Sequence, residues 1–388
     1  MEYQFNRLKY DAIIVGGRCA GLATAMLLAR AGARVLIIER DGEIGDTLST
    51  HKLMRPAVSL LNSWGLLEHI DQAGTPPVRQ THFHYGHEQI TVDIKPEGIL
   101  KGLYAPRRWL LDGVLSDAVV SAGAELHLGT RVIATIKKNC GRVAGVVIRQ
   151  RDGTSEIVGT DILVGADGRC SSVAEMVGSR YMARSIDRYS TVYTYVKDIP
   201  NQGYRWYFDQ GAFAGLIPTT GGEHCLFASS APNSFARWFG KDPYQGAMNM
   251  LSIWEPSLAA KLAQQGVADW VRRFAGAPGH IRECAGPGWA LVGDAGYFKD
   301  PATAHGITDA FLDADRLAAA LIKAPGDARA YQTERDQYAT EVFAITQEIA
   351  SRRWDLKRIK SLHKDFSEAM RREQASLENN NIAAHAAA

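Results

Sequence analysis

The 388-residue sequence lacks the features of a secreted, membrane-spanning or nucleic-acid-binding protein. Its five cysteines form no CxxC pair and no zinc-ligand spacing, which argues against a disulfide framework. The longest stretch without Asp, Glu, Lys or Arg is residues 210–222, and a membrane span needs about 20. The 44 basic and 42 acidic side chains leave a net charge of +2, which gives no general attraction to nucleic acid or anionic lipid. Residues 1–7 lack the apolar core of a signal peptide, so we expect a soluble, cytoplasmic protein.

What the sequence does contain, near its start, is a strand, a glycine loop, a helix and a second strand. Residues 10–15 are apolar and β-branched, typical of a buried parallel strand. The loop Gly16-Gly17-Arg18-Cys19-Ala20-Gly21 follows, then an Ala/Leu-rich helix to Arg30 and a strand over residues 34–39. The order of these elements predicts a dinucleotide-binding unit.

Each part of this unit has a physical role in binding a dinucleotide. Gly16 permits the tight turn, Gly21 allows the helix to pack closely on the sheet, and the helix N-terminus offers N–H groups to a pyrophosphate. Glu39 follows the loop at about the 20-residue distance of an acid that holds ribose hydroxyls. Arg18 stands where the middle glycine is usual, and its guanidinium is a candidate phosphate contact. The alternative is a structural turn that binds nothing.

Two later strands end in aspartates. Residues 161–169 read as a strand followed by Asp167-Gly168, and residues 289–295 as a strand followed by Gly293-Asp294, with a helix from Thr308 to about Ile322. Ligands of open α/β sheets bind beyond the carboxyl ends of the strands. Taken singly, each aspartate would more often be a helix cap or a turn residue.

With these three motifs in order over residues 10–322, the chain resembles the FAD-dependent monooxygenases of the p-hydroxybenzoate hydroxylase type and the related geranylgeranyl reductases. The resemblance implies an α/β fold: a Rossmann-like FAD-binding domain, a mostly antiparallel β-sheet substrate domain and C-terminal helices. It implies an FAD domain at 1–75, 101–184 and 276–326 and a substrate domain at 76–100 and 185–275. Residues 327–377 are expected to be helical and the low-complexity residues 378–388 disordered.

The resemblance also implies roles for single residues. Asp294 would accept hydrogen bonds from the ribityl chain, Val132 would contact adenine through its backbone, and Asp167 would position its loop. Ala304 and His305 depart from the glycine and glutamine of many members. The expected ligands of non-covalent FAD are Gly16, Gly17, Arg18, Ala20, Gly21, Glu39, Arg40, Arg108, Val132, Asp167, Asp294, Pro301, Ala304, Gly306 and Ile307.

The substrate side is less well defined by the sequence. His51, Tyr207 and His305 are candidate pocket residues, and the aromatic side chains of residues 190–208 suit an apolar or aromatic substrate, although ordinary sheet packing explains each one singly. His82 and His84 share one face of a strand, but no acid or cysteine completes a ligand set, so we expect no metal.

No second glycine loop follows a strand, so NAD(P)H is expected to bind transiently as reductant while FAD occupies the single dinucleotide site. The resemblance favours NAD(P)H-dependent monooxygenation of a small molecule by dioxygen through a flavin C4a-hydroperoxide. The alternatives are an FAD-dependent reductase of carbon–carbon double bonds and a flavin-binding module without catalysis.

Overall fold

The computed structural model describes residues 9–266 and 270–386, with side chains described as far as residue 376. Its larger sheet has eight strands, in which β16-β17-β8-β1-β2-β5 are neighbours and β7 and β6 extend the sheet from β8. The five strands from β17 to β5 run parallel. The bounds are β1 (Lys9–Val15), β2 (Val35–Ile38), β5 (Glu125–His127), β6 (Arg131–Lys137), β7 (Val143–Arg149), β8 (Ser155–Gly165), β16 (Ala285–Gly286) and β17 (Trp289–Leu291).

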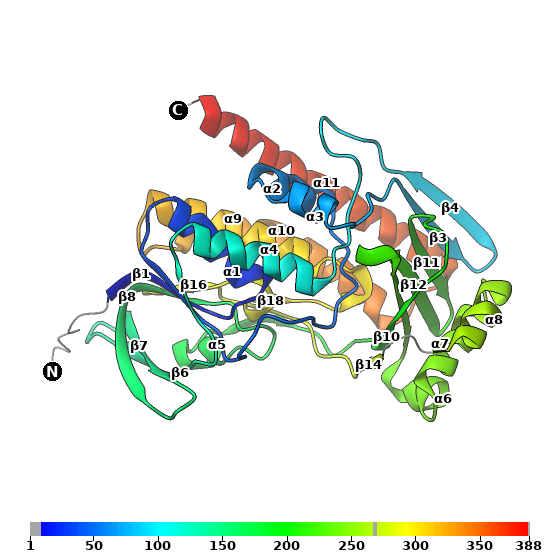
Figure 1. Ribbon diagram of the computed structural model, residues 1–388, viewed down its shortest axis with the longest axis horizontal. Coiled ribbons are helices and arrows are strands. Elements are labelled where there is room, and N and C mark those ends of the chain that lie inside the picture. Colours follow the sequence, from blue (N-terminus) through cyan, green and yellow to red (C-terminus); the bar gives the residue numbers. More distant parts are fainter. Residues whose placement is uncertain (1–8, 267–269, 387–388) are drawn as a thin grey trace.

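Helices cover this sheet and follow from the same local sequence signals. The helix α1 (Cys19–Arg30) connects β1 to β2, and almost all of its side chains are buried because its Ala/Leu-rich sequence packs between the sheet and other helices. Figure 1 shows α1 beside α4 (Arg108–Ser121) and α9 (Gly306–Lys323) on one side of the sheet. The predicted Rossmann-like fold is therefore confirmed.

The second sheet has seven strands in the order β14-β10-β13-β12-β11-β3-β4 and is antiparallel except for the β11–β3 pair. Its strands come from two separate stretches of the chain: β3 (Gln80–Tyr85), β4 (Glu88–Asp93), β10 (Ser190–Val196), β11 (Tyr204–Asp209), β12 (Ala212–Pro218), β13 (His224–Ser230) and β14 (Val271–Phe274). One face packs on α6 (Phe235–Phe239), α7 (Pro243–Leu251) and α8 (Pro256–Gln265), and the other joins the main core. The mostly antiparallel sheet is as expected, while the exact division into domains stays a prediction.

The remaining elements fill the space around and between the two sheets. They are α2 (Arg55–Ser63), α3 (Leu67–Gln72), α5 (Ser172–Val177), the 3-10 turns η1 (Thr220–Gly222), η2 (Pro232–Ser234), η3 (Gly293–Ala295) and η4 (Pro301–Thr303), and the small sheet of β9 (Tyr181–Arg184), β15 (His280–Arg282) and β18 (Tyr297–Phe298).

The C-terminal helices α10 (Arg329–Ser351) and α11 (Leu356–Ala386) tie the two sheets together. In Figure 1 α11 begins beside the seven-stranded sheet and runs back over the helices of the first sheet. Its His363 accepts or donates a 2.7 Å hydrogen bond with Tyr85 of β3. The helix includes residues 378–386, where the composition predicts disorder, and residues 387–388 lie outside the described part.

Candidate active site

The three sequence motifs meet at one edge of the parallel sheet. Gly16 follows β1, Asp167 follows β8, and Asp294 follows β17, and these three strands are immediate neighbours. Because parallel strands end on the same side, loops more than 100 residues apart in sequence converge there. The sheet order therefore brings the three motifs together at one edge.

The glycine loop is shaped by close backbone contacts. Gly16 has φ +112°, and a Cβ there would overlap the carbonyl oxygen of Ala166. A Cβ on Gly21 would in turn overlap the carbonyl oxygen of Gly16. The N-terminus of α1 has no side-chain cap and no acid in its first turn, so its N–H groups are free to bind an anion.

Glu39 is fixed beside this loop at the end of β2. Its carboxylate accepts hydrogen bonds from the N–H of Gly17 at 2.6 Å and of Asp41 at 2.9 Å, and the side chain is buried. A carboxylate has about four acceptor positions, so two remain for ribose hydroxyls. Arg40 is exposed, and Val132 is a buried residue of β6. Neither lines the main cavity.

Two arginines and one buried aspartate stand at the start of α1. Asp112 is fully buried in α4 and accepts hydrogen bonds from Arg108 at 2.9 and 3.1 Å. Arg18 lies 3.4 Å from the same carboxylate and 3.6 Å from Asp41. Both guanidinium groups line the cavity, and Asp112 holds them there.

The Asp167 side chain is hydrogen-bonded within its own loop. Its carboxylate accepts hydrogen bonds from the N–H of Ser172 at 2.7 Å and of Val173 at 3.1 Å, so it caps the start of α5. The cavity wall at this point is formed instead by Gly168 and Arg169. Asp167 thus orders the loop, and its neighbours face the cavity.

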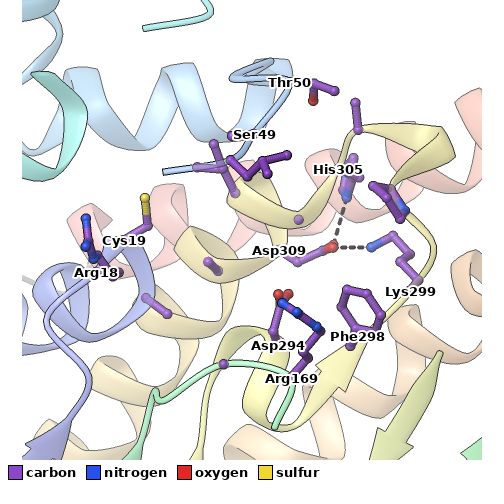
Figure 2. Close-up of a pocket in the computed structure, with 18 of the residues that line it drawn as sticks. Arg18, Cys19, Ser49, Thr50, Arg169, Asp294, Phe298, Lys299, His305 and Asp309 are labelled. Carbon is purple, nitrogen blue, oxygen red and sulfur yellow. Dashed lines mark hydrogen bonds and ion pairs between the residues drawn. The ribbon is translucent and has the colours of Figure 1, made fainter. Parts of the chain in front are cut away.

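A cavity of about 270 Å³ lies between the glycine loop, the start of α9 and the edge of the seven-stranded sheet. Figure 2 shows Arg169 and Asp294 close together on its wall. No donor among the described residues bonds to the Asp294 carboxylate, which therefore suits the hydroxyl groups of a ligand. Burial, together with nearby Asp309, raises the pKa of Asp294 to about 6.

Lys299, His305 and Asp309 form a charged cluster on the same wall (Figure 2). Asp309 accepts a hydrogen bond from His305 Nδ1 at 2.7 Å and pairs with the Lys299 ammonium. Burial by itself would raise the pKa of Asp309. Lys299 and His305 outweigh burial and lower this pKa to about 2.

The loop before α9 contains a residue in the left-handed region. Ala304 has φ +49°, a conformation that glycine adopts more readily than a residue with a Cβ. Pro301, Ala304, His305, Gly306 and Ile307 all line the cavity beside the helix N-terminus.

Two of the predicted pocket residues do not reach the cavity wall. Tyr207 faces the opposite side of β11, because successive strand residues alternate, and its hydroxyl donates to Glu255 at 2.9 Å. His51 is fully buried and hydrogen-bonded to Tyr195. Burial, with nearby Arg108 and Arg107, lowers the pKa of His51 well below its ordinary value. Of the three candidates, only His305 lines the cavity.

Lys52, Arg169, Lys299 and Asp309 line the cavity but were not among the residues predicted from the sequence. The only sequence signal was the spacing of His305 and Asp309, which are four residues apart at the start of a helix. Among the described residues, no group of three His, Cys, Asp or Glu side chains is placed to hold a metal. Within the same residues no helix is long and apolar enough to span a membrane.

Comparison with known proteins agrees with this geometry. The FAD binding domain family matches residues 9–352. A menaquinone reductase from Mycolicibacterium smegmatis is 26% identical over 368 residues, which are 88% of this chain and 83% of the reductase.

Solved structures share the fold at lower identity. PqsL, a probable FAD-dependent monooxygenase from Pseudomonas aeruginosa, has a TM-score of 0.79 at 20% identity over 92% of this chain and 100% of its own. Another structure of PqsL is a complex with 2-aminobenzoylacetate. Aklavinone-11 hydroxylase, in a ternary complex with FAD and aklavinone, has a TM-score of 0.73 at 22% identity over 90% of this chain and 70% of its own.

Proposed function

Because the chain belongs to the FAD binding domain family, it is an FAD-dependent oxidoreductase, and we propose that it is a monooxygenase of a small molecule. The observation that carries this proposal is the cavity where the three motifs meet the aromatic face of the seven-stranded sheet. Its wall provides groups for a cofactor at one end and aromatic side chains, Tyr193 and Phe274, at the other.

The chain's own residues would bind and orient FAD along this cavity. The free N–H groups of α1 and the Arg18 guanidinium suit the pyrophosphate, Glu39 the ribose and Asp294 the ribityl hydroxyls. The N-terminus of α9 beside Ala304 and Gly306 favours negative charge on the bound ring. FAD itself supplies the redox chemistry and the activation of dioxygen.

The size and polarity of the cavity support a small substrate. A volume of about 270 Å³ is slightly below the usual range of ligand pockets, about 300–1,000 Å³, and part of it is needed for the flavin. Many of its lining side chains are charged: Arg18, Lys52, Arg108, Arg169, Asp294, Lys299, Asp300 and Asp309. A long isoprenoid chain would require an elongated apolar channel instead.

The second candidate function is reduction of a substrate by FAD without oxygen transfer. It is favoured by the menaquinone reductase, whose similarity extends over 88% of this chain. NAD(P)H is the proposed reductant in both cases. Because FAD would occupy the single glycine loop, NAD(P)H would bind only transiently.

The fate of dioxygen separates the two functions. Ligands that accelerate reduction of the bound flavin by NADH or NADPH are identified first. Turnover is then run under ¹⁸O₂ with catalase present, and hydrogen peroxide is measured in a parallel reaction without catalase. A monooxygenase places one labelled atom in the product, as measured by mass spectrometry. An unlabelled product that forms equally well without oxygen would establish the reductase, while NAD(P)H consumption with hydrogen peroxide as the only product would support neither.

A further inference from the structure

Lys52 is a buried cation on the cavity wall. It lies in the segment between β2 and α2, and only 7% of the residue is exposed. Among the described residues, no carboxylate pairs with its ammonium group and no acceptor is hydrogen-bonded to it. The other buried lysine of the wall, Lys299, is paired with Asp309. Burying an ammonium group without a counter-charge costs free energy of folding. Lys52 therefore differs from Lys299, whose charge is balanced by an ion pair.

Its surroundings hold further donors without acceptors. The Lys52 nitrogen lies 4.6 Å from the ring centre of Trp206 and 5.8 Å from that of Tyr204. These two rings are two residues apart on β11 and share one face of the sheet. The Trp206 indole nitrogen and the Tyr204 hydroxyl are both buried and have no hydrogen-bond partner among the described residues. Such groups are rarely left unsatisfied in native proteins.

Lys52 lines the cavity, and the Trp206 and Tyr204 rings lie behind it without lining the cavity themselves. Arg18, Cys19 and Asp294 belong to the glycine-loop and strand-end motifs, whereas Lys52 contacts β11 of the seven-stranded sheet. His363 of α11 lies near Lys52. Burial, together with the charge of Lys52, lowers the pKa of the His363 imidazole to about 3. A neutral histidine does not supply the missing negative charge.

We propose that Lys52, whose ammonium lies over the ring of Trp206, binds a carboxylate of the substrate that enters the cavity. The ammonium supplies the charge, and the aromatic side chains of the cavity wall, Tyr193 and Phe274, favour a substrate whose apolar or aromatic body adjoins the anion. The inference rests on the proposed function only in requiring that a small substrate enters the cavity beside the flavin.

The test measures binding to the oxidised, FAD-loaded protein, without NAD(P)H. The probes are benzoate and 2-naphthoate and their neutral carboxamides, with affinity read from the flavin absorbance difference spectrum. Lys52→Met removes the charge with little change in length, Lys52→Arg keeps the charge, and Lys241→Met is the matched control at an exposed lysine.

The expected result is that the wild-type protein binds the carboxylates at least tenfold more tightly than the carboxamides. Lys52→Met loses this preference while its affinity for FAD and for the carboxamides stays within twofold, and Lys52→Arg and Lys241→Met retain it.

Three results would overturn it: equal binding of acids and amides by the wild-type protein, an unchanged preference in Lys52→Met, or no binding of any probe to the wild-type protein. Weaker FAD binding by Lys52→Met with unchanged carboxylate affinity would assign Lys52 to the cofactor and also contradict it. Since no turnover is needed, a protein that selects acids through Lys52 but incorporates no labelled oxygen keeps this inference and loses only the monooxygenase proposal.

Discussion

His305 and Asp309 lie one turn apart at the start of α9, and the imidazole Nδ1–H is donated to the carboxylate across 2.7 Å. The carboxylate is ionised because Lys299 and His305 lower its pKa to about 2 in spite of its burial. The bond fixes the imidazole against the cavity wall, with its ring edge-on to Phe366 of α11. Asp309 therefore holds two cavity-lining side chains in place, and its replacement should lower the stability of the protein.

Asp309→Asn should destabilise the protein by about 3–5 kcal/mol, because it leaves the buried Lys299 ammonium without a counter-charge. The midpoint of urea unfolding measures the loss, and Asp327→Asn, at an exposed ion pair, is the control. The double variant Lys299→Met/Asp309→Leu should recover much of the stability. An equal midpoint for wild type and Asp309→Asn would show that the pair is not a structural element.

Asp294→Ala should weaken FAD binding by about 1.5–3 kcal/mol, roughly ten- to a hundredfold in Kd, because a hydrogen-bonding carboxylate of the cavity is lost. Fluorescence titration of the apoprotein with FAD measures this change. Asp152→Ala, in an exposed loop, should bind FAD as the wild type does. An Asp294→Ala protein with unchanged FAD affinity would remove Asp294 from the cofactor site.

Glu39→Gln should weaken FAD binding while leaving the reactivity of the saturated protein unchanged. Gly17 and Asp41 donate to different oxygens of the Glu39 carboxylate, so the amide keeps an acceptor for only one of them, and the charge that favours ribose hydroxyls is lost. The flavin reduction rate at saturating FAD is the readout that separates a ribose ligand from a residue near the reacting atoms. A lower rate at saturation would contradict the assignment.

Benzoate binding should weaken as the pH rises through the pKa of Lys52. Burial lowers that pKa to about 7, so the free protein carries the ammonium below this pH and the neutral amine above it. The groups that face the amine are the Tyr204 and Trp206 rings from β11 and the neutral His363 from α11. Affinity should therefore fall above pH 7, by up to about tenfold per pH unit.

The Lys52→Arg variant is the control for this pH profile. A guanidinium stays charged throughout the range, so its benzoate affinity should show no decrease between pH 7 and 9. The same decrease in both proteins would place the titrating group elsewhere.

The parts of the fold and site that depend on local sequence pattern could be predicted before the structure was known. The buried strand, glycine loop and acid at Glu39 identified the dinucleotide unit, because the turn at Gly16 and the packing at Gly21 tolerate no side chain. The strand-end positions of Asp167 and Asp294 were also predictable, since a short apolar run ending in an aspartate carries its own signal.

Which side chains face the cavity depends on packing between distant parts of the chain, and local pattern does not predict it. Tyr207 and Trp206 are neighbours in an aromatic strand, and only the packing of α6–α8 on one face determines that Tyr207 points away from the site. Lys52 looks like any polar loop residue in the sequence. Its isolation from every described carboxylate arises because β11 and α11, distant in the chain, close over it. The unpaired charge that suggests the substrate's chemistry is therefore a property of the folded protein.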